Sequence, residues 1–356
     1  MKKLSILLFF ILLISCKNKD LKKEIQENLP AAIKETEPIL VASFEGQQVT
    51  GVTVTKEGQL FANFPRWREG VRHSVVEVGA GETRPYPNES WNNWKLGDTL
   101  QDSVFVAVQS VVASNHKLYV LDTRNPLFQG VQGAPRVFTF DLYTNTLERT
   151  YVFSEESFHS DSYINDLRID VAHKHAYFTD SGHAGLVILD LESGKTKRVL
   201  DNHTSTLAET NQLIIDGKPW KNTVHSDGIA LDTENGLLYY HALTGYNLYA
   251  VPVKTLLEGT DQEIEKSVQL IQKTPAPDGM IFDAKGNLYL ADLEQHKILS
   301  LDTSGNLNVI ASGENVRWVD TFSIYNGELY YTNSRIHEAK ANVSDLTFTI
   351  YKVNIN

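Results

Sequence analysis

The sequence contains one cysteine among its 356 residues, so no disulfide can form within the chain. It has no Cys/His cluster with the spacing of a zinc site, no Gly-x-Ser-x-Gly nucleophile elbow and no His-Glu-x-x-His motif. Positive charge is scarce, with 33 Lys and Arg residues against 44 Asp and Glu residues and a formal charge of -11. Because nucleic acids and anionic membrane surfaces select for basic proteins, we expect neither as the main partner.

Long hydrophobic runs are also missing, apart from residues 4–14. That run is too short to span a bilayer, which takes about 20 residues, and after Lys2 and Lys3 it fits a secretory signal peptide. It ends at Ser15-Cys16, which resembles a bacterial lipobox, where the cysteine is acylated and becomes the mature N-terminus. An ordinary signal peptide with a chance cysteine is the alternative. We predict a lipoprotein signal peptide over residues 1–15, lipidation of Cys16, and a membrane-anchored protein of the cell envelope, periplasmic or surface-exposed.

Residues 16–38 are predicted to be the lipidated cysteine and a flexible tether, because Lys, Glu and Asn dominate them. From residue 39 onward, short runs of Val, Ile, Leu, Tyr and Phe alternate with polar residues and end at Gly, Asn or Asp, which is typical of strands. One unit recurs six times: a small or acidic head, an apolar strand, a polar turn, and a second strand carrying Leu-Tyr or its equivalent. The units begin near residues 50, 109, 165, 226, 277 and 319, which are 42 to 61 residues apart.

This repeat predicts an all-β fold, a six-bladed β-propeller over residues 39–356. Stacking the units around an axis would bury faces that a single sheet leaves exposed. The alternating segment 347–353 has no unit of its own, so we expect it to pair with residues 40–44 and to close the ring with both ends of the chain. A β-sandwich and two separate β domains are the alternatives, and the even spread of the six units opposes both.

The heads of the six units carry the candidate site. The first strand of each blade lines the channel of a propeller, so the heads are expected to meet at one mouth. They are Thr50, Gln109, Asn165 with Asp166, Asp227, Asp278 and Asp320. Carboxylates so close together repel one another unless a cation compensates them, and either calcium or a ligand ammonium would do so. The alternative is that these acids only bond backbone amides at the strand starts, above all in the Asp-Gly pairs. We predict Gln109, Asn165, Asp166, Asp227, Asp278 and Asp320 as ligand-binding residues.

Two further groups of residues are less informative about function. The second strands end in polar residues, which we expect at the opposite end of the strand pair and interpret mostly as turn formers: Asn63, Asp122, Asp180, His241, Asp292 and Asn333. Aromatic residues also gather in two loops, where they either cover a pocket or pack under a blade. One loop carries Tyr86, Trp91 and Trp94, and the other carries Trp67 beside Arg66, Arg68 and Arg72.

Several motifs together resemble the major royal jelly protein/Yellow family, in its bacterial branch often labelled dopachrome-tautomerase-related. They run in order from about residue 44 to 335 and include the segments 63–67, 108–111, 121–126, 163–166, 179–182, 225–229 and 320–322. The resemblance implies a six-bladed propeller. Insect relatives serve in pigmentation and nutrition, and salivary members bind biogenic amines in the channel.

A more distant resemblance is to the calcium-dependent gluconolactonase and diisopropyl-fluorophosphatase propellers. Asp278, in Pro277-Asp278-Gly279-Met280, resembles their metal ligand and base, so the resemblance implies a catalytic role for it. Asn165 and Asp227 resemble the two Asn-type residues of that metal site, which makes Asn165, Asp227 and Asp278 the metal candidates and calcium the cofactor candidate. Thr50 replaces the metal-binding Glu, and losing that charge weakens a divalent site.

Three functions remain open from the sequence. The first is a monomeric binding protein that holds a small cationic or aromatic molecule at the channel mouth. The second is an enzyme, a lactone hydrolase or a tautomerase-like isomerase, in which calcium would polarise the substrate and Asp278 would move a proton. The third is an interaction scaffold.

Overall fold

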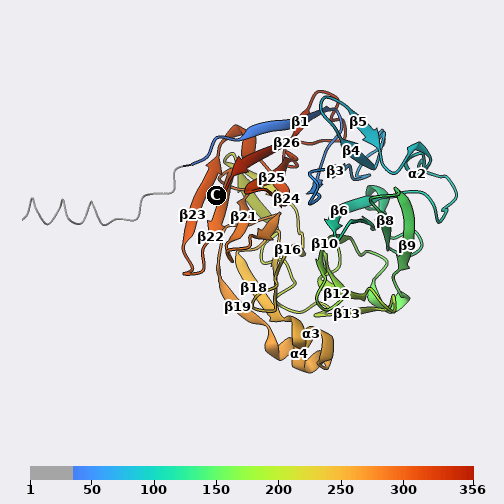
Figure 1. Ribbon diagram of the computed structural model, residues 1–356. Coiled ribbons are helices and arrows are strands. Elements are labelled where there is room, and N and C mark those ends of the chain that lie inside the picture. The colour runs from blue at the N-terminus through green and yellow to red at the C-terminus, as the bar shows by residue number, and fades with distance from the viewer. Residues whose placement is uncertain (1–34) are drawn as a thin grey trace, which may run out of the picture. The chain divides into compact units, whose positions relative to one another are not determined.

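A ring of six four-stranded antiparallel sheets makes up most of the computed structural model, which describes residues 35–356 (Figure 1). The first strands of consecutive sheets contact one another around the ring, and the first strand of the sixth sheet contacts that of the first. This arrangement confirms the predicted six-bladed propeller. The predicted signal peptide, Cys16 and most of the tether lie outside the described residues. Within residues 35–356, no helix has the length and apolar character needed to cross a membrane.

Each blade uses four strands, and in five of the six they follow one another in sequence. Blade 1 contains β2 (Gly51–Val54), β3 (Leu60–Asn63), β4 (Val75–Val78) and β5 (Thr83–Pro85). Blade 2 contains β6 (Val108–Ser114), β7 (Lys117–Asp122), β8 (Arg136–Asp141) and β9 (Thr146–Val152). Blade 3 contains β10 (Ile164–Asp170), β11 (His175–Asp180), β12 (Gly185–Asp190) and β13 (Thr196–Val199). Blade 4 contains β16 (Ser226–Asp232), β17 (Leu237–Ala242), β18 (Asn247–Pro252) and β19 (Gln269–Lys273). Blade 5 contains β20 (Met280–Phe282), β21 (Leu288–Asp292), β22 (Lys297–Leu301) and β23 (Leu307–Ser312).

Blade 6 joins the two ends of the described chain. It contains β24 (Val319–Tyr325), β25 (Glu328–Asn333), β26 (Thr347–Asn354) and, as its outer strand, β1 (Ile39–Glu45). The pairing of β1 with β26 runs from Ile39 opposite Lys352 to Glu45 opposite Thr347. The predicted closure is therefore confirmed. This pairing adds a strand from the start of the described chain to a sheet from its end, and so joins the two ends of the ring.

The turns between the first and second strands explain the recurring polar residues of the repeat. In blade 6 the two-residue turn Asn326-Gly327 has φ values of 50° and 74°, the left-handed region that favours Asn and Gly in tight hairpins. Gly58 has φ 87° in the corresponding turn of blade 1. The turn residues therefore fix where each hairpin reverses, and the hydrophobic alternation then fixes which side chains face the neighbouring blades.

Aromatic and aliphatic side chains fill the spaces between blades. Trp91 packs against Phe105, Phe138 and Phe140, with ring centroids 5.0 to 5.1 Å apart. Tyr86 belongs to the same cluster and is 3% exposed. For this loop, the prediction of packing under a blade is the one the structure confirms.

Other elements interrupt the repeat. Three helices are short: α2 (Glu89–Asn92), α3 (Val253–Glu258) and α4 (Asp261–Ser267). Single 3-10 turns occur at η1 (Pro126–Phe128), η2 (Glu155–Ser157) and η3 (Glu314–Val316). A separate hairpin, β14 (Gln212–Ile215) with β15 (Lys218–Lys221), lies in the chain between blades 3 and 4. At its turn, Asp216 accepts a hydrogen bond from His296 Nε2 at 2.8 Å and pairs with Arg317, which ties the hairpin to blades 5 and 6.

Candidate functional site

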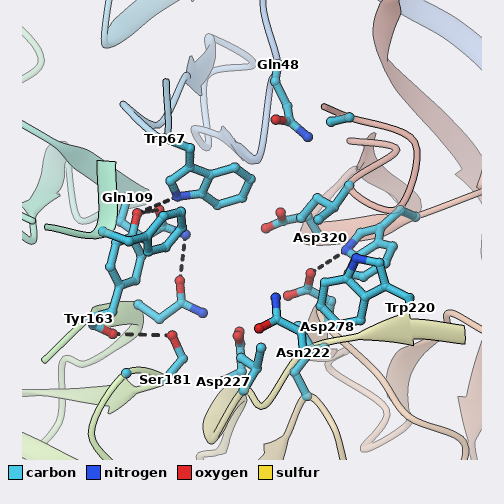
Figure 2. Close-up of a pocket in the computed structure, with 18 of the residues that line it drawn as sticks. Gln48, Trp67, Gln109, Tyr163, Ser181, Trp220, Asn222, Asp227, Asp278 and Asp320 are labelled. Carbon is cyan, nitrogen blue, oxygen red and sulfur yellow. Dashed lines mark hydrogen bonds between the residues drawn. The ribbon is translucent and has the colours of Figure 1, made fainter. Parts of the chain in front are cut away.

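The candidate site is a cavity of about 510 Å³ at the end of the ring where the first strands begin (Figure 2). Five predicted head residues line it, one from each of blades 2 to 6: Gln109, Asn165, Asp227, Asp278 and Asp320. At the start of blade 1, Gln48 lines the cavity in place of the expected Thr50, which lies two residues later in the chain. The Thr50 hydroxyl is buried and accepts a hydrogen bond from Asn63.

Backbone bulges aim four of these heads at the cavity. The strand register shifts between Val108 and Ser110, between Ile164 and Leu167, between Ser226 and Ile229, and between Val319 and Phe322. Each shift spans a head residue: Gln109, Asn165, Asp227 or Asp320. A bulge adds one residue to one strand and re-aims its side chain. The same local irregularity therefore presents a polar group to the cavity in four blades.

The two Asp-Gly pairs owe their glycines to close backbone approach. A Cβ on Gly228 would lie 2.6 Å from the carbonyl oxygen of Asp278, and a Cβ on Gly279 would lie 2.6 Å from that of Asp320. Each glycine therefore lets the head of the next blade come close. The Asp227 and Asp278 carboxyl groups line the cavity, and their hydrogen-bond partners are side chains rather than backbone amides.

The residues at the ends of the second strands lie beside the heads, and the expectation that they lie at the opposite end is wrong. In an antiparallel pair the second strand ends where the first begins, so Asp122 is opposite Val108 and Asp180 is opposite Ile164. Asp122 accepts hydrogen bonds from the backbone amides of Val106 and Ala107, both at 2.8 Å. Asp180 does the same for Tyr163 at 2.8 Å. These acids hold the segments that lead into the first strands, so their predicted structural role is correct.

A chain of side-chain hydrogen bonds runs along one side of the cavity (Figure 2). Trp67 Nε1 donates to the Tyr163 hydroxyl at 2.5 Å, and that hydroxyl donates to Gln109 Oε1 at 2.7 Å. Gln109 Nε2 then donates to Asn165 Oδ1 at 2.6 Å, and the nearby Asn165 amide lowers the pKa of Asp227. These bonds link the partly buried Trp67 to buried side chains of blades 2 and 3. Because the Gln109 oxygen accepts from Tyr163 and its nitrogen donates to the Asn165 oxygen, the chain fixes the orientation of both amides.

Three carboxyl groups of the cavity lining, those of Asp227, Asp278 and Asp320, have raised pKa values. Burial raises the pKa of Asp278 to about 7, partly offset by Trp318 Nε1, which donates to Asp278 Oδ2 at 2.6 Å. Burial, and then the neighbouring Asp278 and Asp166 charges, raise the pKa of Asp227 well above its usual range. The same two causes, burial and neighbouring aspartates, raise the pKa of Asp320. Asp227 and Asp278 are also close enough to affect each other's pKa values.

The prediction that Asp166 faces its fellow acids in the cavity is not met. Its carboxylate pairs with Arg168 at 2.9 Å, accepts from the Ser110 hydroxyl at 2.7 Å, and is not part of the cavity lining. Adjacent residues of a strand point to opposite sides, so Asn165 and Asp166 do not both reach the cavity easily. Arg168 also donates to the carbonyl oxygen of Met280 at 2.6 Å. The Asp166–Arg168 pair thus bridges blades 3 and 5 away from the cavity lining.

Aromatic walls flank the acids, and sequence reasoning missed most of them. On one side Trp67 stacks on Phe128 at 5.9 Å between centroids, and Phe128 lies 4.9 Å from Tyr163. On the other side Trp220 packs edge-on against Trp318 at 5.0 Å. Figure 2 shows Trp67 and Tyr163 across the cavity from Trp220, Asp278 and Asp320. Trp318 and Tyr163 precede their heads by two residues, a spacing that could have flagged them, whereas Trp220 comes from a hairpin outside the repeat.

The carboxyl oxygens of the cavity are the type of ligand atom that calcium prefers, but their spacing does not suit a calcium ion. Calcium takes six to eight oxygen ligands at about 2.3–2.6 Å, so its ligand atoms lie within about 5 Å of one another. Within residues 35–356, Asp227, Asp278 and Asp320 do not bring three carboxylate oxygens within 4.8 Å of one another. Asn165, which was predicted as a metal ligand together with Asp227 and Asp278, has its oxygen bonded to Gln109. In this arrangement the residues do not fit a calcium ion.

Comparison with known proteins decides the family. The family model described as major royal jelly protein matches residues 106–356. The chain belongs to the major royal jelly protein family. The resemblance inferred from the motifs is therefore confirmed. The matched region of this family member contains blades 2 to 5 and the strands β24, β25 and β26 of blade 6. No curated protein matches the chain in sequence.

Solved structures share the fold at low sequence identity. A luciferin-regenerating enzyme is 14% identical with a TM-score of 0.55, over 89% of this chain and 95% of that one. Regucalcin from Agrobacterium tumefaciens, a calcium-binding protein, is 14% identical with a TM-score of 0.52, over 92% and 98%. A gluconolactonase from Xanthomonas campestris is 12% identical with a TM-score of 0.52, over 92% and 98%. Structural similarity at such low sequence identity establishes a shared fold and nothing about function.

Proposed function

We propose that this member of the major royal jelly protein family binds a small organic cation with an aromatic body in the cavity. The observation that carries the proposal is the set of three cavity-lining carboxyl groups with raised pKa values. Arg68 is the only basic side chain among the described lining residues, and its guanidinium donates to Gln48 at 2.6 Å. A ligand ammonium would therefore supply the missing positive charge. Trp67, Phe128 and Trp220 would contact its apolar part, and aromatic faces also attract cations.

Calorimetric titration with tryptamine tests this function directly. We expect saturable binding to one site per chain with a dissociation constant below about 1 mM. Because a bound ammonium lowers the pKa values of the nearby carboxyl groups, binding at pH 7 is expected to release protons. Titration in two buffers of different ionisation enthalpy measures that release. No binding at millimolar tryptamine would contradict the proposal for arylalkylamines.

Hydrolysis of a lactone is the second candidate, because one observation favours it. A carboxyl group with a pKa of about 7 is suited to general acid–base catalysis at neutral pH, and burial gives Asp278 that value. The chain shares its fold with a gluconolactonase and with regucalcin, which agrees with this candidate but does not establish it.

Titration with calcium separates the two candidates. From the poor convergence of the carboxylate oxygens, we expect no saturable calcium binding at millimolar concentration and no calcium-dependent hydrolysis of glucono-δ-lactone. Calcium binding that is lost in both the Asp227→Asn and Asp278→Asn variants would instead favour the metal-dependent enzyme. A scaffold role, the third candidate, would leave both titrations flat.

Membrane anchoring through Cys16 is part of the proposed function. The support is the position of the sole cysteine directly after the short apolar run of residues 4–14. We expect mass spectrometry of the native protein to find an acylated Cys16 as the first residue, and the protein to fractionate with membranes as a monomer. The Cys16→Ala variant is expected to lose the lipid and the membrane association. An unmodified Cys16 in the mature chain would contradict the lipoprotein assignment.

A further inference from the structure

Two histidine rings stack on each other at the loops of blade 3, among residues that the proposed function does not use. His159 follows η2, and His183 lies in the turn between β11 and β12. Their ring centroids are 3.7 Å apart, with 27° between the planes. Asp201, just after β13, completes the group: its Oδ1 lies 3.1 Å from His159 Nε2 and 3.9 Å from His183 Nε2.

These separations, 3.1 and 3.9 Å, lie on either side of the distance between two ligand atoms of a zinc ion. At bond lengths of about 2.0–2.2 Å and tetrahedral angles, two ligand atoms lie roughly 3.3–3.6 Å apart. The three ligand atoms of His159, His183 and Asp201 all lie within 4.8 Å of one another. Imidazole nitrogen and carboxylate oxygen are ligands that zinc accepts, and three protein ligands leave a fourth position for water or a bound molecule.

The hydrogen bonds around His183 orient it as a ligand. Its Nδ1 lies 3.0 Å from Asp161 Oδ1. Because an ionised carboxylate only accepts, Nδ1 carries the hydrogen, and the Nε2 lone pair is left for the group formed with His159 and Asp201. The Nδ2 amide of Asn202 already points at that lone pair from 3.0 Å. A carboxylate behind a histidine is the usual outer partner of a metal-binding imidazole.

The surrounding charges also favour a divalent cation. Arg198 is 5% exposed and bonds the Asp201 carboxylate, which holds that ligand in place. The same guanidinium pairs with Asp180 at 2.9 Å. One guanidinium therefore faces two carboxylates, those of Asp180 and Asp201. The Asp161 carboxylate beside His183 adds a third negative charge to this part of the surface.

A second histidine group differs in one decisive respect. Asp216, His296 and His337 bring their ligand atoms equally close together. There, however, Arg317 Nη2 pairs with Asp216 and lies 3.3 Å from His337 Nε2. A guanidinium thus already contacts two of the three ligand atoms. This second group is a matched internal control, because it has the same residue types but a guanidinium against one of its ring nitrogens. In the first group Arg198 bonds the Asp201 carboxylate and neither ring nitrogen.

We propose that His159, His183 and Asp201 bind one zinc-class divalent cation, with Asp161 as the outer partner of His183. The site lies next to the rim of the cavity in sequence, since Ser181 and Gly182 line the cavity and His183 follows them directly. It is independent of the amine site, so either can fail without the other.

Calorimetric titration of the chelator-treated, dialysed protein with zinc chloride tests the site. We expect one ion per chain with a dissociation constant in the micromolar range or lower, and at least a tenfold loss of affinity in His159→Gln and in His183→Gln. Asp161→Asn should lower the affinity by roughly 10–100-fold, the usual effect of removing an outer partner. The control variant His296→Gln should bind zinc as the unchanged protein does.

Two further readouts keep the test decisive. Thermal unfolding of each variant without zinc establishes that it folds, and zinc should raise the unfolding temperature of the unchanged protein and of His296→Gln but not of His183→Gln. Absence of saturable zinc binding by the unchanged protein in the micromolar range would overturn the proposal. Undiminished affinity in both folded variants, His159→Gln and His183→Gln, would overturn it as well.

Discussion

Asp278→Asn is expected to weaken tryptamine binding by about 2 kcal/mol, which is roughly 30-fold. Removing one partner of a buried charge pair usually costs about 2–5 kcal/mol, and we expect the lower end because Asp227 and Asp320 remain in the cavity. The substitution isolates the charge, since the Asn side-chain oxygen can still accept the Trp318 indole hydrogen that Asp278 accepts now. Calorimetric titration of both proteins at pH 7 measures the difference.

A charge-matched variant controls for the overall field of this acidic protein. Glu156→Gln removes one negative charge from an exposed position in η2, outside the cavity lining. It is expected to bind tryptamine with unchanged affinity. Equal binding by Asp278→Asn and the unchanged protein would refute the amine site as described here. Equal weakening in Glu156→Gln would show that long-range charge, rather than the cavity carboxyl groups, attracts the ligand.

The second large effect is on stability: Asp278→Asn should make the ligand-free protein more stable at pH 8, although it weakens binding. The folded-state pKa of Asp278, about 7, lies above the value of about 3.9 expected in the unfolded chain. The folded protein therefore keeps a proton that the unfolded chain releases. The contribution of this group to the free energy of unfolding is therefore full below about pH 4 and falls as the pH rises from about 4 to about 7. Asp227 and Asp320, whose pKa values burial also raises, act in the same direction.

Urea unfolding at pH 5 and pH 8 measures this effect. Between those conditions the unchanged protein should lose about 2–3 kcal/mol of unfolding free energy relative to Asp278→Asn, at about 1.4 kcal/mol per pH unit. The comparison with the variant is needed because burial lowers the pKa values of His241 and His337 to about 4. These two groups make stability rise with pH between about 4 and 6.5 in both proteins. Identical pH dependence in the two proteins would contradict the raised pKa of Asp278.

Local rules explain why the fold was predictable from the sequence. Each blade carries its own instructions: alternating apolar residues, a turn such as Asn326-Gly327 with positive φ values, and a second strand that ends in a residue such as Asp180. These interactions join residues close in sequence, so they leave a pattern that repeats. Even the pairing of β1 with β26, which lie at opposite ends of the described chain, was predictable. The strand pattern near the C-terminus belongs to none of the six repeat units, so the strand at the start of the propeller was its expected partner.

The site was predictable only in part, because it depends on which way individual side chains turn. The repeat identified the heads, and Asp227, Asp278 and Asp320 do line the cavity. No pattern distinguishes Asn165 from the adjacent Asp166, however, since a bulge decides which of two neighbours faces inward. Trp220 reaches the cavity from the β14–β15 hairpin, which has no counterpart in the other blades.

The sequence by itself therefore determined the number of blades, the closure of the ring, the family and the acidic character of one channel mouth. All of these follow from periodic patterns, turn residues and residue types, which are properties of short segments. Only the tertiary structure decided the aromatic walls, the hydrogen-bond chain from Trp67 to Asn165, the withdrawal of Asp166 to Arg168 and the raised pKa values. Each of these depends on desolvation or on contacts between blades, and such contacts join residues that lie far apart in the chain.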